Sequence, residues 1–197
     1  MKGKTALVLT LPVVFIMLLL VLPALSPAAE LDCTKCHEQL TKGKFVHKAL
    51  DMGCTTCHGG IDAAAMPHKK KNSRARGLTS DQPELCYGCH DKGNFTKKNV
   101  HAAVAMGCTG CHNPHSSDMF ALLANKPLQV CLQCHADSAE HGKHARPSGD
   151  KEPEDPKKPG RSFYCGSCHA PHSSNTPLLF QFDAQSVTGL CLNCHKY

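Results

Sequence analysis

The sequence contains no tryptophan and few large aliphatic residues. Leu, Ile, Val and Phe together make up about 15% of 29–197, below the roughly 20% at which a chain is expected to lack a core of its own. Such a chain cannot bury enough apolar side chain to offset the conformational entropy lost on folding. A self-sufficient globular enzyme core is therefore disfavoured, and something else must supply the apolar interior.

The N-terminal segment, 1–28, contains no acidic residue. Lys2 and Lys4 precede an apolar stretch at 6–25, and small residues follow at Ser26 and Ala28. This order predicts a secretory signal peptide, 1–28, cleaved after Ala28. The alternative is an uncleaved inner-membrane anchor, because the stretch approaches the roughly 20 residues that span a bilayer. In both cases residues 29–197 are expected in the periplasm or outside the cell, where disulfides are tolerated.

All 14 cysteines belong to Cys-x-x-Cys pairs, and a histidine directly follows each pair. This pentapeptide is the c-type haem attachment signature, because two thiols add to the porphyrin vinyl groups and the adjoining histidine ligates iron. The seven copies, sites 1–7 in chain order, are Cys33-Cys36-His37, Cys54-Cys57-His58, Cys86-Cys89-His90, Cys108-Cys111-His112, Cys131-Cys134-His135, Cys165-Cys168-His169 and Cys191-Cys194-His195. The sequence therefore predicts seven covalent haems.

Zinc is the main competing interpretation of these cysteines. The intervals from Cys36 to Cys54 and from Cys89 to Cys108 both fall within the roughly 15–20 residues that separate the cysteine pairs of zinc ribbons. Zinc ribbons need pairs of pairs, however, and seven is odd. With histidine at about 7% of residues, seven histidines would follow the pairs by chance with a probability on the order of 10⁻⁸. A disulfide framework and thioredoxin-like pairs leave the same histidines unexplained.

Seven further histidines match the seven haems, which indicates a second histidine ligand for each iron. They are His47, His68, His101, His115, His141, His144 and His172. Four of them lie in repeated segments. Residues 45–58 and 99–112 agree at 9 of 14 positions and place His47 and His101 seven residues before a motif cysteine. Residues 111–117 and 168–174 share Cys-His-x-Pro-His-Ser-Ser, which contains His115 and His172.

The remaining candidates have weaker patterns. His68 follows site 2 at a longer spacing, and His141 and His144 lie in a polar segment in which one of them could be free. Methionine is the rival axial ligand and would raise the reduction potential. The candidates are Met52, Met66, Met106 and Met119, but methionine is more often apolar packing.

The chain is expected to be mainly irregular, with short α-helices wrapped around haems and little or no β-sheet. No alternating strand pattern persists. Apolar positions four apart, Val46/Leu50 and Val100/Val104, predict short helices that Gly53 and Gly107 end. The repeats suggest modules at about 29–68, 85–135 and 140–197, separated by polar connections at 69–84 and 145–161, the latter expected to be a mobile loop.

These motifs resemble the multihaem c-type cytochromes, specifically the class III (cytochrome c3/c7-like) group with doubled Cys-x-x-Cys-His motifs. Residues 108–135 and 165–195 carry the doubled motif, and His141-x-x-His144 looks like that group's paired histidines. The resemblance implies export, anaerobic respiration, bis-histidine haems and electron transfer. Seven sites and the long 145–161 segment depart from the small members, so an extended row of haems is as good an expectation as a compact cluster.

Two histidine ligands leave an iron no open position, which predicts an electron carrier rather than an enzyme. Expected partners are a membrane quinol-oxidising complex, a terminal reductase or other multihaem cytochromes. One alternative is a reductase of nitrite, hydroxylamine or a sulfur oxyanion with one open haem. The other is a subunit that self-assembles into a conductive filament or joins a larger redox complex.

The positive charge of the sequence does not predict nucleic-acid binding. The formal charge is +6, or +4 without Lys2 and Lys4, and 14 haem propionates would bring the holoprotein to about −10. The basic run at 69–76 has no interleaved aromatic residues. It is better interpreted as a solvated patch that neutralises propionates or docks a redox partner.

Overall fold

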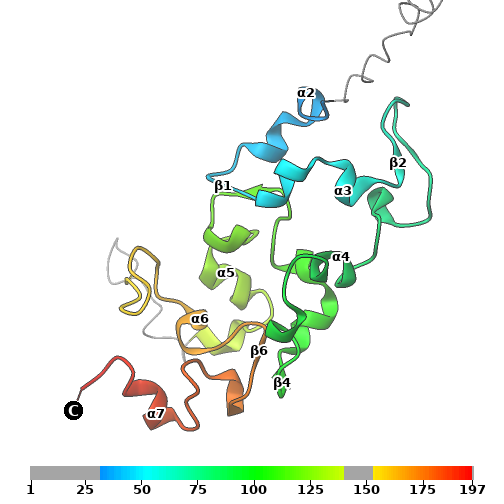
Figure 1. The fold of residues 1–197 in the computed structure, drawn as a ribbon. Helices are drawn as coiled ribbons and strands as arrows, with labels where there is room; N and C mark the ends of the chain where they lie inside the picture. Colours follow the sequence, from blue (N-terminus) through cyan, green and yellow to red (C-terminus); the bar gives the residue numbers. More distant parts are fainter. Residues whose placement is uncertain (1–31, 140–152, 197) are drawn as a thin grey trace, which may run out of the picture. The chain divides into compact units, whose positions relative to one another are not determined.

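The computed structural model describes residues 32–139 and 153–196, and the chain from Cys33 onward forms one unit. Its helices and strands are short and joined by coil (Figure 1). The α-helices are α2 (Thr34–His37), α3 (Thr55–His58), α4 (Glu84–Tyr87), α5 (Pro127–Leu132), α6 (Cys165–Cys168) and α7 (Val187–Cys191). The strands are β1 (Phe45–Val46), β2 (Ile61–Asp62), β3 (Lys69–Lys70), β4 (Asn99–Val100), β5 (Ser116–Ser117) and β6 (Ser173–Ser174).

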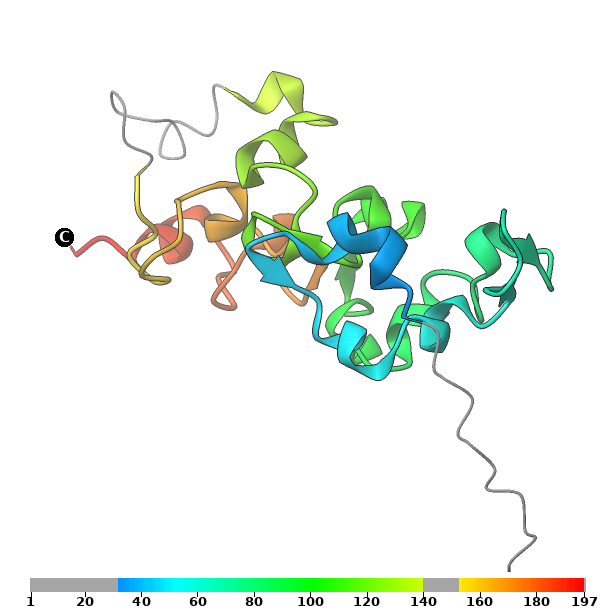
Figure 2. The same ribbon diagram turned by 90° about the horizontal axis from the view of Figure 1, so that it is seen from above.

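Short 3₁₀ helices connect these elements. They are η1 (Glu38–Thr41), η2 (Lys48–Met52), η3 (Ala75–Gly77), η4 (Lys92–Asn94), η5 (Ala102–Met106), η6 (Cys108–Gly110), η7 (Phe120–Leu122), η8 (Ala136–Ala139) and η10 (Pro177–Leu179). Each sheet among the described residues has two strands, and the turned view likewise shows coil between short elements (Figure 2). The expected fold class, mainly irregular with short helices and little β-sheet, is confirmed.

Two of the strand pairs are copies of each other. β1 pairs with β5 through Phe45↔Ser117, and β4 pairs with β6 through Asn99↔Ser174. In both copies the serine that begins the second strand accepts a hydrogen bond from the backbone just before the first strand, at 3.1 and 3.3 Å. The repeated segments seen in the sequence therefore bind each other, the first histidine segment to the first Pro-His-Ser-Ser segment and the second to the second.

The third strand pair differs from the other two, because its strands come from neighbouring parts of the chain. β2 pairs with β3 within one short segment, through Ile61↔Lys70. Ile61 lies three residues after the site 2 histidine, the position that His115 and His172 occupy at sites 4 and 6. The segment after site 2 lacks the Pro-His-Ser-Ser sequence, and its strand β2 pairs with the nearby β3 instead of with a distant strand.

The expected helices that begin at Val46 and Val100 are wrong in their first turn. Both valines lie in strands, and the helices that follow, η2 and η5, are 3₁₀ helices. Their ends are as expected, because Gly53 and Gly107 adopt φ of 85° and 93°, which glycine tolerates. The β pairing with distant segments overrides the local helical pattern.

Large apolar side chains lie mostly at the surface of the described residues. Only Leu123, Phe180 and Ala184 are buried hydrophobic residues among them. Met106, Met66 and Leu178 are 72%, 72% and 70% exposed. This agrees with the small apolar content of the sequence and leaves room for an apolar group that is not protein.

The two polar connections contain more structure than the sequence suggests. Residues 69–84 include β3 and η3, and Asn72 donates to the Leu78 carbonyl at 2.8 Å. The predicted loop at 145–161 lies partly outside the described residues. Its described part, 153–161, is a turn around Asp155, which is 2% exposed and accepts a hydrogen bond from Ser167 at 2.6 Å.

Candidate haem sites

Each of the seven motifs forms one turn that places its cysteines and histidine together. In every copy the histidine N–H donates to the carbonyl of the first cysteine, at 2.9–3.1 Å. This i→i−4 bond is the α-helical one, and it sets the second thiol and the imidazole on neighbouring sides of the same turn. The local geometry is therefore uniform at sites 1–7.

None of the 14 cysteines forms a disulfide in the structure. Structural zinc sites need four clustered ligands. Among residues 32–139 and 153–196, no group of three or more His, Cys, Asp or Glu side chains is arranged to hold a metal ion in this way. Neither of the main alternatives to haem attachment fits the described sites.

Five motif histidines each face one of the other histidines. The pairs are His37–His68 at site 1, His58–His115 at site 2, His47–His90 at site 3, His112–His172 at site 4 and His101–His135 at site 5. The ring centroids are 5.9–6.1 Å apart, and the ring planes differ by 16–37°. Each pair joins one motif histidine to one that lies outside the motifs.

This spacing fits two imidazoles on opposite sides of one metal ion. With metal–nitrogen bonds of about 2 Å on each side, the two ring centroids of such a pair lie about 6 Å apart. All five independent pairs fall close to this separation. Direct packing of aromatic rings gives a much broader range, about 4.5–7 Å. The residues present therefore fit a haem iron at sites 1–5.

In each pair, one ring donates a hydrogen bond from Nδ1, which leaves its Nε2 available as a metal ligand. At sites 2 and 4 the motif histidine donates from Nδ1 to a backbone carbonyl, of Arg76 at 3.0 Å and of Ala121 at 2.8 Å. At sites 1, 3 and 5 the second histidine does so, at 2.8–2.9 Å. A hydrogen-bonded Nδ1–H fixes the tautomer and leaves the Nε2 lone pair free.

Burial also keeps two of these imidazoles neutral. Burial lowers the pKa of His115, with further contributions from His58, Arg76 and His47. Burial likewise lowers the pKa of His172, whose ring lies 4.8 Å from the Phe95 ring. A neutral imidazole is the form that binds a metal.

Neighbouring sites contact each other through their cysteines. Burial and a hydrogen bond to Cys108 raise the pKa of Cys86 to about 11, so the first cysteines of sites 3 and 4 are adjacent. The first cysteines of sites 5 and 6 are adjacent too, because a hydrogen bond with Cys131 lowers the pKa of Cys165 to about 6.

Weaker electrostatic contacts connect the other neighbours. Cys57 of site 2 adds to the raised pKa of Cys86, and the pKa of Cys131 is raised by its hydrogen bond with Cys165, by burial and, to a smaller extent, by Cys111 of site 4. The pKa of Cys168 at site 6 is raised by burial first and then by both cysteines of site 7. Sites 2–7 are thus neighbours in chain order.

Two candidate ligands, His141 and His144, lie outside the described residues. Sites 6 and 7 therefore have described motif histidines, His169 and His195, and no described second histidine to compare. Among the rival methionines, Met52, Met66 and Met106 are 54–72% exposed, whereas a histidine already faces the motif histidine at each of sites 1–5.

The backbone carbonyls that bind the motif histidines are the feature that sequence reasoning missed. They belong to Arg76, Ala121 and, at site 6, Leu178, which accepts from His169 Nδ1 at 2.7 Å. At sites 4 and 6 these carbonyls lie beside the Leu-Leu pairs 122–123 and 178–179, which are offset by one residue, so that Ala121-Leu122 corresponds to Leu178-Leu179. Arg76 lies in the segment interpreted as a polar connection.

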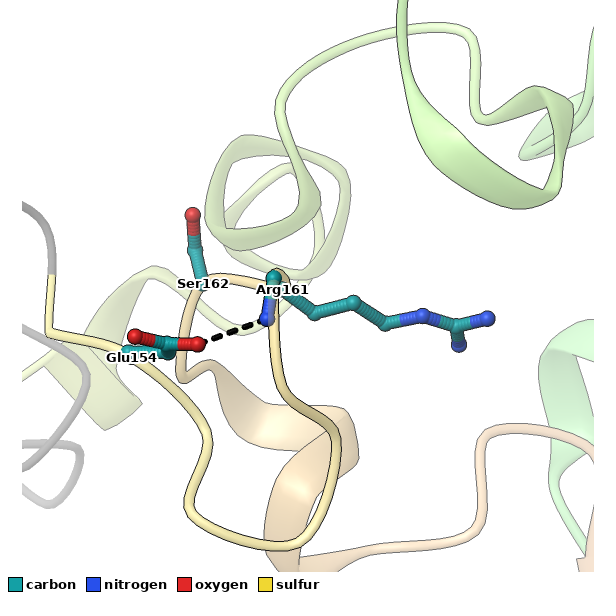
Figure 3. A pocket seen from close by; sticks show the side chains of 4 residues that line it. Glu154, Arg161 and Ser162 are labelled. Atoms are coloured by element: carbon teal, nitrogen blue, oxygen red, sulfur yellow. Dashed lines mark hydrogen bonds between the residues drawn. The ribbon is translucent and has the colours of Figure 1, made fainter.

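A shallow polar pocket near site 6 has no such organisation. The pocket has a volume of about 190 Å³ and is lined by Glu154, Gly160, Arg161 and Ser162. The Glu154 carboxylate accepts a hydrogen bond from the Gly160 N–H at 2.6 Å. The Arg161 side chain points away from Glu154 (Figure 3), and its guanidinium lies 4.9 Å from the Phe120 ring centre. This pocket brings no histidine or cysteine together.

Comparison with known proteins agrees with the site geometry. The doubled CXXCH motif family matches residues 47–95, 101–140 and 158–197. The chain is 32% identical over 188 residues to the multiheme cytochrome MtrA of Shewanella baltica, a match covering 86% of this chain and 54% of the relative. The chain thus spans about half the length of that relative. Among the described residues, no helix is long and apolar enough to cross a membrane.

Proposed function

The chain belongs to the doubled CXXCH motif family and is a multihaem c-type cytochrome, and on this premise we propose that it carries seven covalent haems and transfers electrons between redox partners. The observation that carries the proposal is the set of five facing histidine pairs. Bound haem supplies a reversible one-electron change at iron. The protein supplies spacing, axial ligands and electrostatics.

At sites 1–5 a pair of histidines would hold the haem iron. The second ligands follow the ring pairs described above, with His68 at site 1, His115 at site 2, His47 at site 3, His172 at site 4 and His101 at site 5. For sites 6 and 7 the remaining candidates are His141 and His144, which lie outside the described residues. An iron held by two histidines would have no open position for a substrate, which favours an electron carrier over a reductase.

The chain itself links alternate sites, 2 with 4 and 4 with 6. His115 follows the site 4 histidine by three residues yet faces site 2, and His172 follows the site 6 histidine by three residues yet faces site 4. Each Cys-His-x-Pro-His segment therefore ties two sites through one short piece of backbone. Together with the adjacent cysteines of sites 3 and 4, and of 5 and 6, this arrangement supports short electron-transfer steps between neighbouring sites.

The cellular setting follows from the resemblance and from the N-terminal signal. We place the protein in the class III-like group, exported through its 1–28 signal and acting in anaerobic respiration. Its donors and acceptors are a membrane quinol-oxidising complex, a terminal reductase or other multihaem cytochromes. The MtrA relative extends well beyond the region that it shares with this chain, so its own partners are not transferred here.

Electron paramagnetic resonance of the purified protein, with and without cyanide, tests the carrier proposal. All haems are expected to be low-spin, and cyanide is expected to leave the spectrum unchanged because no iron has an open position. A high-spin fraction that binds cyanide or nitrite would overturn the carrier and favour a multihaem reductase.

The exposed lysines next to His68 are expected to dock an acidic electron donor. His68, the second histidine of site 1, is followed directly by three exposed lysines, Lys69, Lys70 and Lys71. We predict that Lys69→Glu/Lys70→Glu slows reduction by an acidic flavodoxin about tenfold at low ionic strength, and much less at high salt, because electrostatic steering is screened. Stopped-flow reduction at several salt concentrations measures this effect.

The matched control is Lys97→Glu/Lys98→Glu, which reverses two exposed charges elsewhere. Equal slowing by both double variants would show that only net charge matters, and would contradict docking at Lys69 and Lys70.

A further inference from the structure

Four short described segments have two successive residues in the left-handed region, and three of them lie at haem sites; the fourth is Phe182-Asp183, with φ of 59° and 53°. Ala121 and Leu122 have φ of 53° and 56°, and Leu178 and Leu179 have φ of 53° and 57°. Arg76 and Gly77 repeat the pattern with φ of 52° and 63°. Residues with a Cβ seldom adopt this left-handed region, and two in succession are rarer still. Such strain persists where the surrounding structure requires it.

At each of sites 2, 4 and 6, one of these segments makes two hydrogen bonds to the haem-attachment motif. We call residues 76–79, 121–124 and 178–181 the straps of sites 2, 4 and 6. The carbonyl of the first strap residue accepts from Nδ1 of the motif histidine, at 3.0, 2.8 and 2.7 Å. The last strap residue donates its N–H to the carbonyl of the second motif cysteine, at 2.9 Å in all three.

Sites 1, 3 and 5 obtain the same bond on the opposite ligand. There the second histidine donates from Nδ1, His68 to Ala65, His47 to Pro114 and His101 to Pro171, at 2.8–2.9 Å. In each of the five pairs the hydrogen bond to a backbone carbonyl is thus made by one imidazole. The partner rings, which face the iron position without such a bond to the described residues, are His37, His90, His135, His115 and His172.

We infer that the left-handed straps set the ligand strength at sites 2, 4 and 6, so that each iron of sites 1–6 receives a hydrogen-bonded imidazole. This inference rests on the proposed haem ligation. A carbonyl that accepts from Nδ1–H makes the ring a more basic ligand, which favours the ferric state and lowers the reduction potential. Because the bond occurs once per pair, it does not distinguish the haems from one another.

Paired substitutions at one strap residue separate backbone conformation from side-chain loss. Ala121 is exposed, so its side chain contributes little packing. Valine at this position disfavours positive φ and moves the carbonyl away from His112, whereas glycine keeps the left-handed conformation. Leu178, which is 70% exposed, offers the same comparison at site 6.

Spectroelectrochemical titration of Ala121→Val, Ala121→Gly and the wild-type holoprotein tests the inference. In Ala121→Val, one haem is expected to move to a higher potential and to shift its haem methyl resonances, while Ala121→Gly superposes on the wild type. Leu178→Val and Leu178→Gly repeat the test if Ala121→Val loses a haem. Equal curves for the valine and glycine variants at both positions would overturn the inference. A wild type with missing or high-spin haems would instead overturn the proposed function.

Discussion

Without haem attachment, the chain is expected to show no cooperative unfolding transition. Only Leu123, Phe180 and Ala184 form buried apolar packing in the described residues, far too little to offset the backbone entropy of a chain this long. The exposed Met52 and Met106 would instead cover porphyrin. Binding and folding free energies are then inseparable, as in small metal-dependent domains.

Circular dichroism during heating measures this prediction on protein produced in cells without haem-attachment machinery. The holoprotein from normal cells is the matched control and is expected to unfold cooperatively. A sigmoidal transition in the haem-free chain, with native-like secondary structure before it, would contradict the view that haem forms the interior.

Replacing His172 with alanine is expected to convert one haem of the seven to a high-spin form that binds cyanide. His172 faces the site 4 histidine, and Phe95 packs against its ring at 4.8 Å, so alanine opens a position without disturbing a motif. His172→Met is the matched control, since methionine can ligate iron and is expected to keep it low-spin at a raised potential. Electron paramagnetic resonance and optical spectra with cyanide measure both.

A second variant identifies the site that His172 serves. With Cys108→Ser/Cys111→Ser, site 4 is expected to lose its haem, and adding His172→Ala should then create no new high-spin signal. His172 is close in sequence to site 6, so a high-spin signal that persists in this background would assign it there and contradict the ring pairing.

The attachment motifs could be recognised from the sequence because the chemistry fixes their residue types and spacing, whereas the second-ligand histidines stay a prediction. The pairing could not be recognised from the sequence. His47 lies seven residues before site 2, yet it faces His90 of site 3, because β1 binds β5 and turns the segment. Such pairing depends on contacts between segments that are far apart in the chain, which local spacing does not encode.

The straps were also beyond sequence reasoning. Ala121-Leu122 and Leu178-Leu179 contain no glycine or asparagine to mark a left-handed turn. Their conformation is set by hydrogen bonds to His112, His169 and the motif cysteines, that is, by tertiary structure. The repeated leucines indicated a repeat without indicating its role.

Intact-protein mass spectrometry of the exported product tests the central claim most directly, that covalently attached haem is the interior around which this chain folds. The account predicts a mass that exceeds the polypeptide by seven haems, with peptide fragments carrying one haem at each Cys-x-x-Cys-His motif. A product without tetrapyrrole adducts, or with zinc bound in their place, would contradict it.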